Sequence, residues 1–162
     1  MFQVLVFLSS SFLALFFGYW IHRALHCEWT GPFFKAHMEH HLKQYPANNL
    51  TSTTYRKARW NNRGPFLFTP PLLVISLLTL CVSALLHIPF WVPMYVFCSF
   101  ILIGVFEDIV HDSTHIRNSY LKSSLFRIIR NDHYVHHIDM TKNFGISTTV
   151  FDRLFGTYSR RR

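Results

Sequence analysis

Three apolar segments divide the chain, each about as long as a membrane-spanning helix. The first, Val4 to Ile21, carries no charged residue. The second and third lie in one apolar stretch, Pro65 to about Val110. This stretch is too long for one helix, and Pro89 near its middle interrupts helical hydrogen bonding. A hydrocarbon core of about 30 Å needs roughly 20 helical residues. The pattern therefore predicts spans at about 4–21, 66–86 and 90–109, the last two joined by a tight hairpin.

A cleaved signal peptide is the alternative interpretation of the first segment. No Lys or Arg precedes the segment, and no clear small-residue cleavage site follows it. We therefore expect a signal anchor that stays in place as the first span.

The positive charges predict the orientation. All 16 Lys and Arg lie in two stretches, 23–63 and 117–162, separated by two of the expected crossings. The positive-inside rule places both stretches in the cytoplasm and the N-terminus outside. Basic loops beside anionic lipid also explain the net charge of +8, so no nucleic-acid partner is expected.

The expected architecture is an all-α integral membrane bundle forming one domain over residues 1–162. Its cytoplasmic cap would comprise residues 22–64 and 111–162, including the C-terminus. The host membrane would be the cytoplasmic membrane of a bacterium or the endoplasmic reticulum.

Ten of the 11 histidines fall into four short clusters with helical spacing. The spacings are HxxxH, HxxHH, HxxxH and HxxHH, so the second half of the pattern repeats the first. The members are His22 and His26; His37, His40 and His41; His111 and His115; His133, His136 and His137. The eleventh, His87, lies in the expected outer hairpin, and we interpret it as an interfacial residue.

The spacing and number of these histidines predict two metal sites. Residues three and four apart share one face of a helix, so each cluster directs its imidazoles toward one point. Imidazole binds first-row transition metals, and structural zinc usually takes only four ligands. Ten ligands fit two ions with five each, leaving about one position open on an octahedral ion. Catalytic residues beyond this metal centre are not predicted.

Carboxylates gather beside the clusters: seven of the eight lie within four residues of a clustered histidine. Such groups either orient a ligating imidazole or solvate helix ends. Glu107 and Asp108 are the best orienting candidates because they approach the membrane core and need partners there.

With these clusters, the chain resembles the fatty acid hydroxylase and sterol desaturase superfamily from about residue 15 to 158. Tyr45-Pro46 after the second cluster and the tail, 142–146 and 151–157, add to the similarity. The resemblance implies that the ten clustered histidines ligate two metal ions, functionally iron, with zinc as a possible occupant of a purified sample. Asn143 in the tail is a further candidate for supporting the ligands.

The resemblance also implies a dioxygen-dependent enzyme that hydroxylates or desaturates a lipid C–H bond. A fatty acyl or related lipid is the first candidate substrate, and a carotenoid or sterol is the alternative. The sequence has neither a cysteine cluster for an iron–sulfur centre nor a dinucleotide-binding fingerprint. Electrons are therefore expected from a separate protein, which the basic cap can attract if that protein is acidic.

Two other classes use histidine-rich membrane sites. A metal transporter or store would place its ligands near the bilayer midplane, and a membrane cytochrome would place haem ligands inside the spans. The clusters here lie at the ends of the expected spans and in the cytoplasmic stretches, which disfavours both classes.

Overall fold

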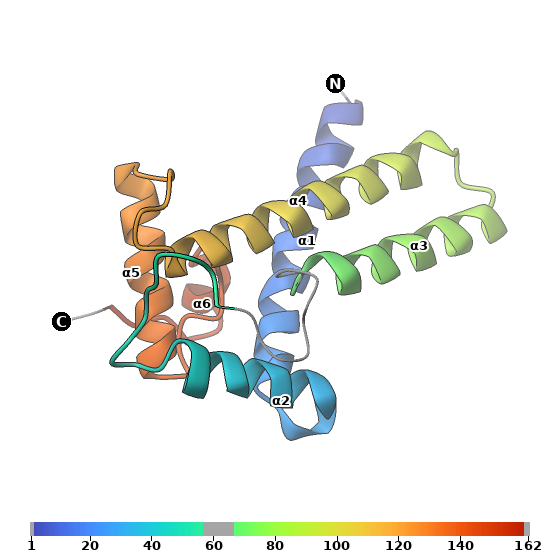
Figure 1. Cartoon of the computed structure of the whole chain (residues 1–162). Coiled ribbons are helices and arrows are strands. Elements are labelled where there is room, and N and C mark those ends of the chain that lie inside the picture. Colours follow the sequence, from blue (N-terminus) through green and yellow to red (C-terminus); the bar gives the residue numbers. More distant parts are fainter. Residues whose placement is uncertain (1, 57–66, 161–162) are drawn as a thin grey trace. The chain divides into compact units, whose positions relative to one another are not determined.

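The computed structural model describes residues 2–56 and 67–160, and over these residues the chain is helical. The helices are α1 (Phe2–Leu25), α2 (Pro32–Glu39), α3 (Thr69–Leu85), α4 (Trp91–His115), α5 (Ser124–Ile138) and α6 (Val150–Leu154), with short turns η1 (Glu28–Thr30) and η2 (His40–Gln44) (Figure 1). The described part contains no strand, only an isolated parallel bridge between Ser52 and Ile116. The predicted all-helical class is confirmed.

Contacts divide the chain into two compact units. The first unit comprises residues 1–18 and 66–108, and the second comprises 19–65 and 109–162. Helices α1 and α4 contribute to both units, because the division falls after Gly18 and after Asp108. All ten clustered histidines belong to the second unit.

The first unit has the pattern of a protein in lipid, apolar outside and polar inside. Large side chains such as Leu78 and Leu85 are exposed, whereas Ser76 and Ser83 on the same helix are buried. The hydroxyls of Ser10 in α1 and Ser99 in α4 lie 2.8 Å apart and join the two helices. Such hydrogen bonds between small polar residues are common where helices pack in a membrane.

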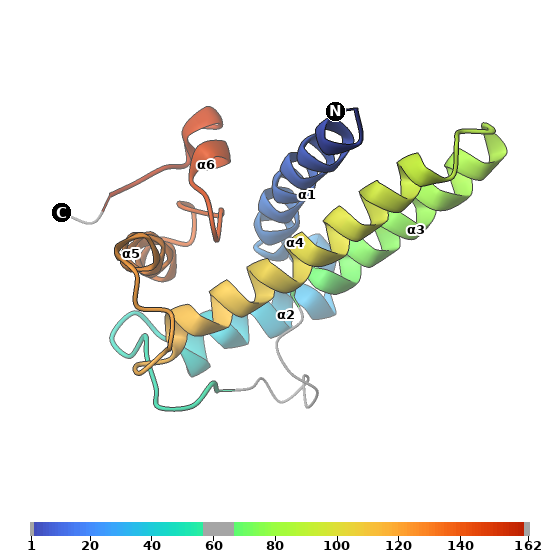
Figure 2. The same ribbon diagram turned by 90° about the horizontal axis from the view of Figure 1, so that it is seen from above.

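Helices α3 and α4 run side by side as a hairpin (Figures 1 and 2). The break between Leu85 and Trp91 includes His87, an exposed residue with a φ of 53°. Gly104 permits the close approach of the pair, because a Cβ there would lie 3.0 Å from the Cα of Thr69. Two prolines at the start of α3 lack only N–H groups that a first helical turn leaves unpaired.

Among the described residues, helices α1 and α4 are long and apolar enough to cross a membrane. Helix α3 is also apolar but has 17 residues, at the lower limit for a span. It falls within the expected span 66–86, of which residue 66 lies outside the described residues, as do residues 57–64 of the expected cap. Crossing of the bilayer by α3 stays a prediction.

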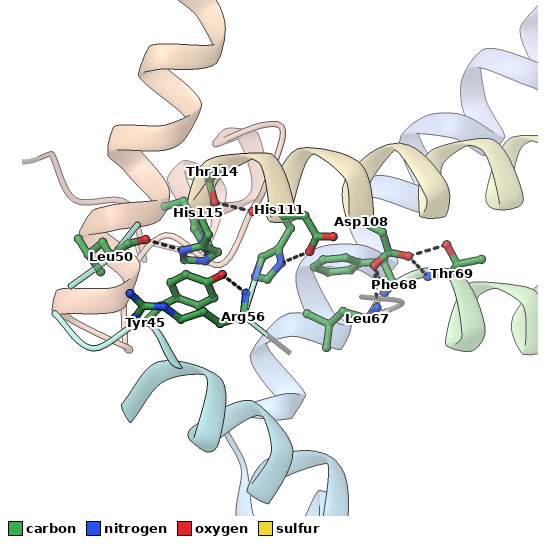
Figure 3. A network of polar contacts seen from close by, with 12 residues as sticks. Tyr45, Leu50, Arg56, Leu67, Phe68, Thr69, Asp108, His111, Thr114 and His115 are labelled. Carbon is green, nitrogen blue, oxygen red and sulfur yellow. Dashed lines mark hydrogen bonds and ion pairs between the residues drawn. The ribbon is translucent and has the colours of Figure 1, made fainter. Parts of the chain in front are cut away.

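The carboxylate of Asp108 connects α4 to the start of α3 within the first unit (Figure 3). Its Oδ1 accepts hydrogen bonds from the backbone N–H groups of Leu67 and Phe68, at 2.7 and 2.9 Å. Its Oδ2 accepts from the N–H and hydroxyl of Thr69, at 3.0 and 2.6 Å. Asp108 therefore caps the N-terminus of α3 and satisfies donors that a helix start leaves open.

The second unit holds the short helices and the ends of α1 and α4. Helix α5 begins at Ser123, whose hydroxyl accepts a hydrogen bond from the N–H of Phe126 at 3.1 Å. The tail is packed by aromatic rings: Tyr19 stacks on Phe155 at 5.3 Å, and its hydroxyl lies 3.1 Å from that of Thr157. This packing holds the tail against the end of α1.

Candidate metal centre

Nine of the ten clustered histidines form two groups with ligand nitrogens facing one another. In each group, the nitrogens all lie within 4.8 Å of one another. The first histidine group is His22, His26, His37, His41 and His136; the second histidine group is His40, His115, His133 and His137. Every member is buried except His26, which is half-buried.

The two HxxHH clusters exchange members between the groups. His37 and His41 belong to the first group, whereas His40 between them belongs to the second. In α5 the order is reversed, because His133 and His137 belong to the second group and His136 belongs to the first. Each of these helical segments therefore supplies side chains to both groups, so the expectation that each cluster directs its imidazoles toward one point is wrong for the two HxxHH clusters.

His111, the tenth clustered histidine, is in neither group but lies beside the second. Its ring centroid is 4.9 Å from that of His40 and 4.8 Å from that of His133. Its Nδ1 lies 3.5 Å from the carboxylate of Asp112. In the repeated pattern His111 corresponds to His22, the first member of the first group.

The change of direction between His40 and His41 coincides with a π-helical turn. Helix α2 ends at Glu39, and residues 40–44 continue as the wider turn η2. Such π-helical turns are frequent at functional sites. Here His40 and His41, adjacent in sequence, contribute to different groups.

Backbone carbonyls set the tautomer of four clustered histidines. In the first group, Nδ1–H of His22 donates to the Phe144 carbonyl at 2.6 Å, and that of His136 donates to Lys142 at 2.7 Å. Because a carbonyl oxygen only accepts, Nδ1 carries the proton, and the neutral ring presents an unprotonated Nε2.

In the second group, Nδ1–H of His137 donates to the carbonyl of Tyr45 at 2.8 Å. His115 donates in the same way to Leu50 at 2.9 Å (Figure 3). The segment after the second cluster thus orients two histidines of the second group, and the segment after the fourth orients two of the first. Partners of this kind orient the ring and increase the basicity of the nitrogen that faces a metal.

The facing nitrogens are close together. In the first group, Nε2 of His26 is 3.1 Å from that of His136 and 3.0 Å from that of His37. Nε2 of His41 follows at 3.1 Å from that of His37. In the second group, Nε2 of His133 and His115 are 3.0 Å apart.

Burial keeps these imidazoles neutral. Burial lowers the pKa of six histidines well below the usual range, and the charges of neighbouring histidines lower it further. These six are His37, His40, His41, His133, His136 and His137. The pKa of half-buried His26 falls to about 4 for the same reason, burial. A neutral imidazole is the form that ligates a metal.

A sequence profile described as fatty acid hydroxylase matches residues 7–157, which is most of the chain. The chain belongs to the fatty acid hydroxylase family. This family is part of the superfamily of membrane hydroxylases and desaturases, and the resemblance inferred from the sequence is confirmed. A search of the solved structures found no significant match.

Membership in the fatty acid hydroxylase family, together with the apolar helices, makes the chain an integral membrane oxidoreductase. The family is metal-dependent, and the two histidine groups can each hold a metal ion. Its lipid substrate is expected within the membrane.

The shortest Nε2 separations permit several imidazoles of one group to ligate the same ion. Ligand nitrogens about 2.1 Å from one ion lie about 3.0 to 3.4 Å apart when adjacent, depending on the coordination geometry. The closest Nε2 pairs, 3.0 to 3.1 Å apart, are within this range. Nε2 of His40 and His137 are also buried without a hydrogen-bond partner in the described structure, which a bound ion would compensate.

A cavity of about 380 Å³ in the second unit reaches the first histidine group at His26. Met38, Met140 and Phe144 give it an apolar lining, and Arg23 places a guanidinium beside it. His26 is the least buried clustered histidine and lies at this cavity, so the cavity is a candidate access route to the first histidine group.

The three residues predicted to support the ligands have different positions. Asp108 bonds to the start of α3, and Glu107 is buried in the first unit. Asn143 is buried in the second unit, where its amide donates to the carbonyls of Asp132 and Ser159 at 3.0 and 2.7 Å. Their role toward the metals stays a prediction.

Sequence reasoning did not identify the residues that support the groups most directly. Tyr45 and Phe144 act through their carbonyls, which any residue type would provide. Asp152, the one carboxylate distant from every histidine cluster, is fully buried and bonds to the Phe144 segment. Its place in the tail motif beside Phe144 and Gly145 was the signal that could have identified it.

Proposed function

We propose that the chain is a dioxygen-dependent di-iron hydroxylase acting on a C–H bond of a fatty acyl or related lipid. The observation that carries the proposal is the pair of histidine groups whose ligand nitrogens all lie within 4.8 Å of one another, the closest Nε2 pairs being 3.0 to 3.1 Å apart. Iron is chosen over zinc because zinc has no redox chemistry. Bound iron would supply activation of dioxygen, which no side chain here provides.

All ten clustered histidines are the proposed ligands, five to each ion. The second group would be completed by His111, whose counterpart in the repeat is His22 and whose ring lies 4.8 Å from that of His133. Five imidazoles leave about one position open on an octahedral ion for dioxygen or water. Both ions would then have equivalent ligand sets.

The protein's own contribution is to orient the ligands and exclude water. The carbonyls of Phe144, Lys142, Tyr45 and Leu50 hold four imidazoles by Nδ1. Burial removes bulk water from the groups, which protects reactive species formed there from side reactions. The apolar cavity at His26 fits a lipid chain entering toward the first group.

Hydroxylation puts one oxygen atom of dioxygen into the C–H bond and releases the other as water, using two electrons from outside and two protons from the solvent. We propose that the basic second unit and the C-terminus face the cytoplasm and that a separate protein delivers the electrons to this unit. An acidic donor would be attracted by the net charge of +8. Rising salt should then slow the reduction; a rate unaffected by salt would contradict charge-guided docking.

The test is mass spectrometry of lipids from cells that express the wild type or a His136→Ala, His137→Ala variant. These two residues belong to different groups, so the variant disables both. The matched control is His87→Ala, an exposed histidine outside both groups. We expect a lipid carrying one extra oxygen with the wild type and the control, and none with the variant.

A lipid that instead loses two hydrogens would show a desaturase, and an oxidised carotenoid or sterol would replace the acyl substrate. Iron analysis of the purified wild type accompanies the lipid measurement. Folded wild type that binds no iron and changes no lipid would refute the proposal.

A further inference from the structure

The tail of the second unit contains a buried carboxylate that the proposed function does not use. Asp152 lies in α6 with no exposed surface, and no basic side chain forms an ion pair with it in the described structure. Burial raises the pKa of this carboxyl group. A buried carboxylate is costly unless several donors surround it, so its partners indicate its role.

Those partners belong to the segment that carries one of the ligand-orienting carbonyls. Oδ1 of Asp152 accepts from the N–H of Phe144 at 2.7 Å, and Oδ2 accepts from the N–H of Gly145 at 2.8 Å. The hydroxyl of Thr157 donates to Oδ1 at 2.8 Å. Two consecutive peptide N–H groups therefore bind one carboxylate.

These hydrogen bonds determine the direction of the Phe144 carbonyl. The Phe144–Gly145 peptide is planar, so its carbonyl points away from the Gly145 N–H that Asp152 binds. That carbonyl accepts the Nδ1 proton of His22 at 2.6 Å. A chain of two hydrogen bonds thus links Asp152 to a proposed ligand without direct contact.

The space around Gly145 fits the same arrangement. A Cβ at this position would collide with the carbonyl oxygen of Thr148 and lie 2.8 Å from Oδ2 of Asp152. Asn143, with a φ of 51°, turns the chain just before the bound peptides, and its own N–H donates to the carbonyl of Thr157 at 3.0 Å. Residues 143–145 are therefore fixed both by the carboxylate of Asp152 and by the carbonyl of Thr157.

We propose that Asp152 is a positioning residue for the first metal site, acting through the Phe144 carbonyl on His22. The proposal rests on the two-metal centre proposed above. It makes the tail motif a support for one of the two sites, because the second group takes its carbonyl partners from Tyr45 and Leu50.

The experiment measures Co²⁺ binding by visible absorption in metal-free, detergent-solubilised protein. Two backgrounds isolate the sites: His115→Ala with His133→Ala leaves the first group, and His26→Ala with His37→Ala leaves the second. Asp152→Asn is added to each. Its amide keeps one acceptor oxygen but places an NH₂ group against a peptide N–H.

We expect Asp152→Asn to weaken Co²⁺ binding about 10- to 100-fold in the first-site background and to leave the second-site background unchanged. Equal weakening in both would show a general structural role and overturn the proposal, as would no weakening in either. Glu28→Gln, which removes an exposed carboxylate, is the charge-matched control and should change neither.

Thr157→Val provides a milder test if Asp152→Asn does not fold. It removes one of the donors to Asp152 and should weaken the first site in the same direction by a smaller factor. Unchanged binding in this folded variant would overturn the proposal. Absence of Co²⁺ binding in both parent backgrounds would instead refute the metal centre, and this inference with it.

Discussion

The ring of Tyr45 stacks on the imidazole of His115, with centroids 4.0 Å apart and planes 23° apart (Figure 3). Tyr45 is fully buried, and its carbonyl accepts the Nδ1 proton of His137. One residue thus positions two members of the second histidine group, by its ring and by its backbone.

Removing the Tyr45 ring should weaken the second metal site selectively. Tyr45→Ala leaves a cavity beside His115, and we expect about 10- to 100-fold weaker metal binding at that site, as for other residues that support ligands. Tyr45→Phe keeps the stacking and loses only the hydroxyl that accepts the N–H of Arg56. Metal titration should show a much smaller effect for Tyr45→Phe, and equal losses in both variants would contradict stacking as the cause.

Neighbouring histidines should affect different metal ions. His40→Ala removes a ligand of the second group and His41→Ala removes one of the first, although the two residues are adjacent. Each variant should retain tight binding of one metal equivalent and lose the other. Site-resolved Mössbauer spectra of ⁵⁷Fe-loaded protein would distinguish the two sites, and identical spectra for both variants would show that the assignment to groups is wrong.

Asp108→Asn should destabilise the first unit. The amide retains one acceptor oxygen for four donors, and each buried donor left unpaired costs about 1–3 kcal/mol. We expect a clearly lower thermal unfolding midpoint in detergent, while Glu28→Gln, at an exposed site, should leave it unchanged. A midpoint equal to that of the wild type would mean that these hydrogen bonds contribute little.

Acid should destabilise the metal-free protein. Burial lowers the pKa of His26 from 6.5 in the unfolded chain to about 4. Between these values the unfolded chain binds more protons, so stability is fully present above pH 6.5 and decreases as the pH falls toward 4. Thermal unfolding at about pH 7 and about pH 5 tests this expectation, and His26→Asn should reduce the dependence on pH.

Filling the cavity should slow the reaction without removing metal. Met140→Trp places a larger side chain in the route to His26. We expect kcat/KM for the lipid to fall at least several-fold with iron content unchanged, because Met140 is not a proposed ligand. Unchanged kinetics would show that substrate approaches from elsewhere.

The sequence predicted the helical class and placed the clustered histidines close together in space because both depend on local spacing. Histidines four residues apart, such as His37 and His41, share a helical face, and both belong to the first group. The assignment of His40 and His41 to different groups was not predictable, since it depends on how the α2–η2 segment and α5 pack around the two groups. Asp108 was correctly expected to need a partner, but the partner is the start of α3, which lies far away in sequence.

The role of Asp152 could not be predicted from its neighbours in the sequence either. A search for carboxylates near the histidines selects Asp112 and Asp132 but passes over Asp152, which acts through a peptide group. Support by backbone groups is hard to predict from a sequence because every residue type carries the carbonyl acceptor.

The exchange of histidines between α5 and the α2–η2 segment has a consequence for the internal repeat. If each half of the repeated histidine pattern formed a complete metal site, each half would bind metal without the other. Here neither copy contains a full set: His40 completes the group built from the second copy, and His136 completes the group built from the first. Each half of the chain therefore supplies a histidine that the group in the other half lacks. Fragments expressed separately should be inactive until they are combined.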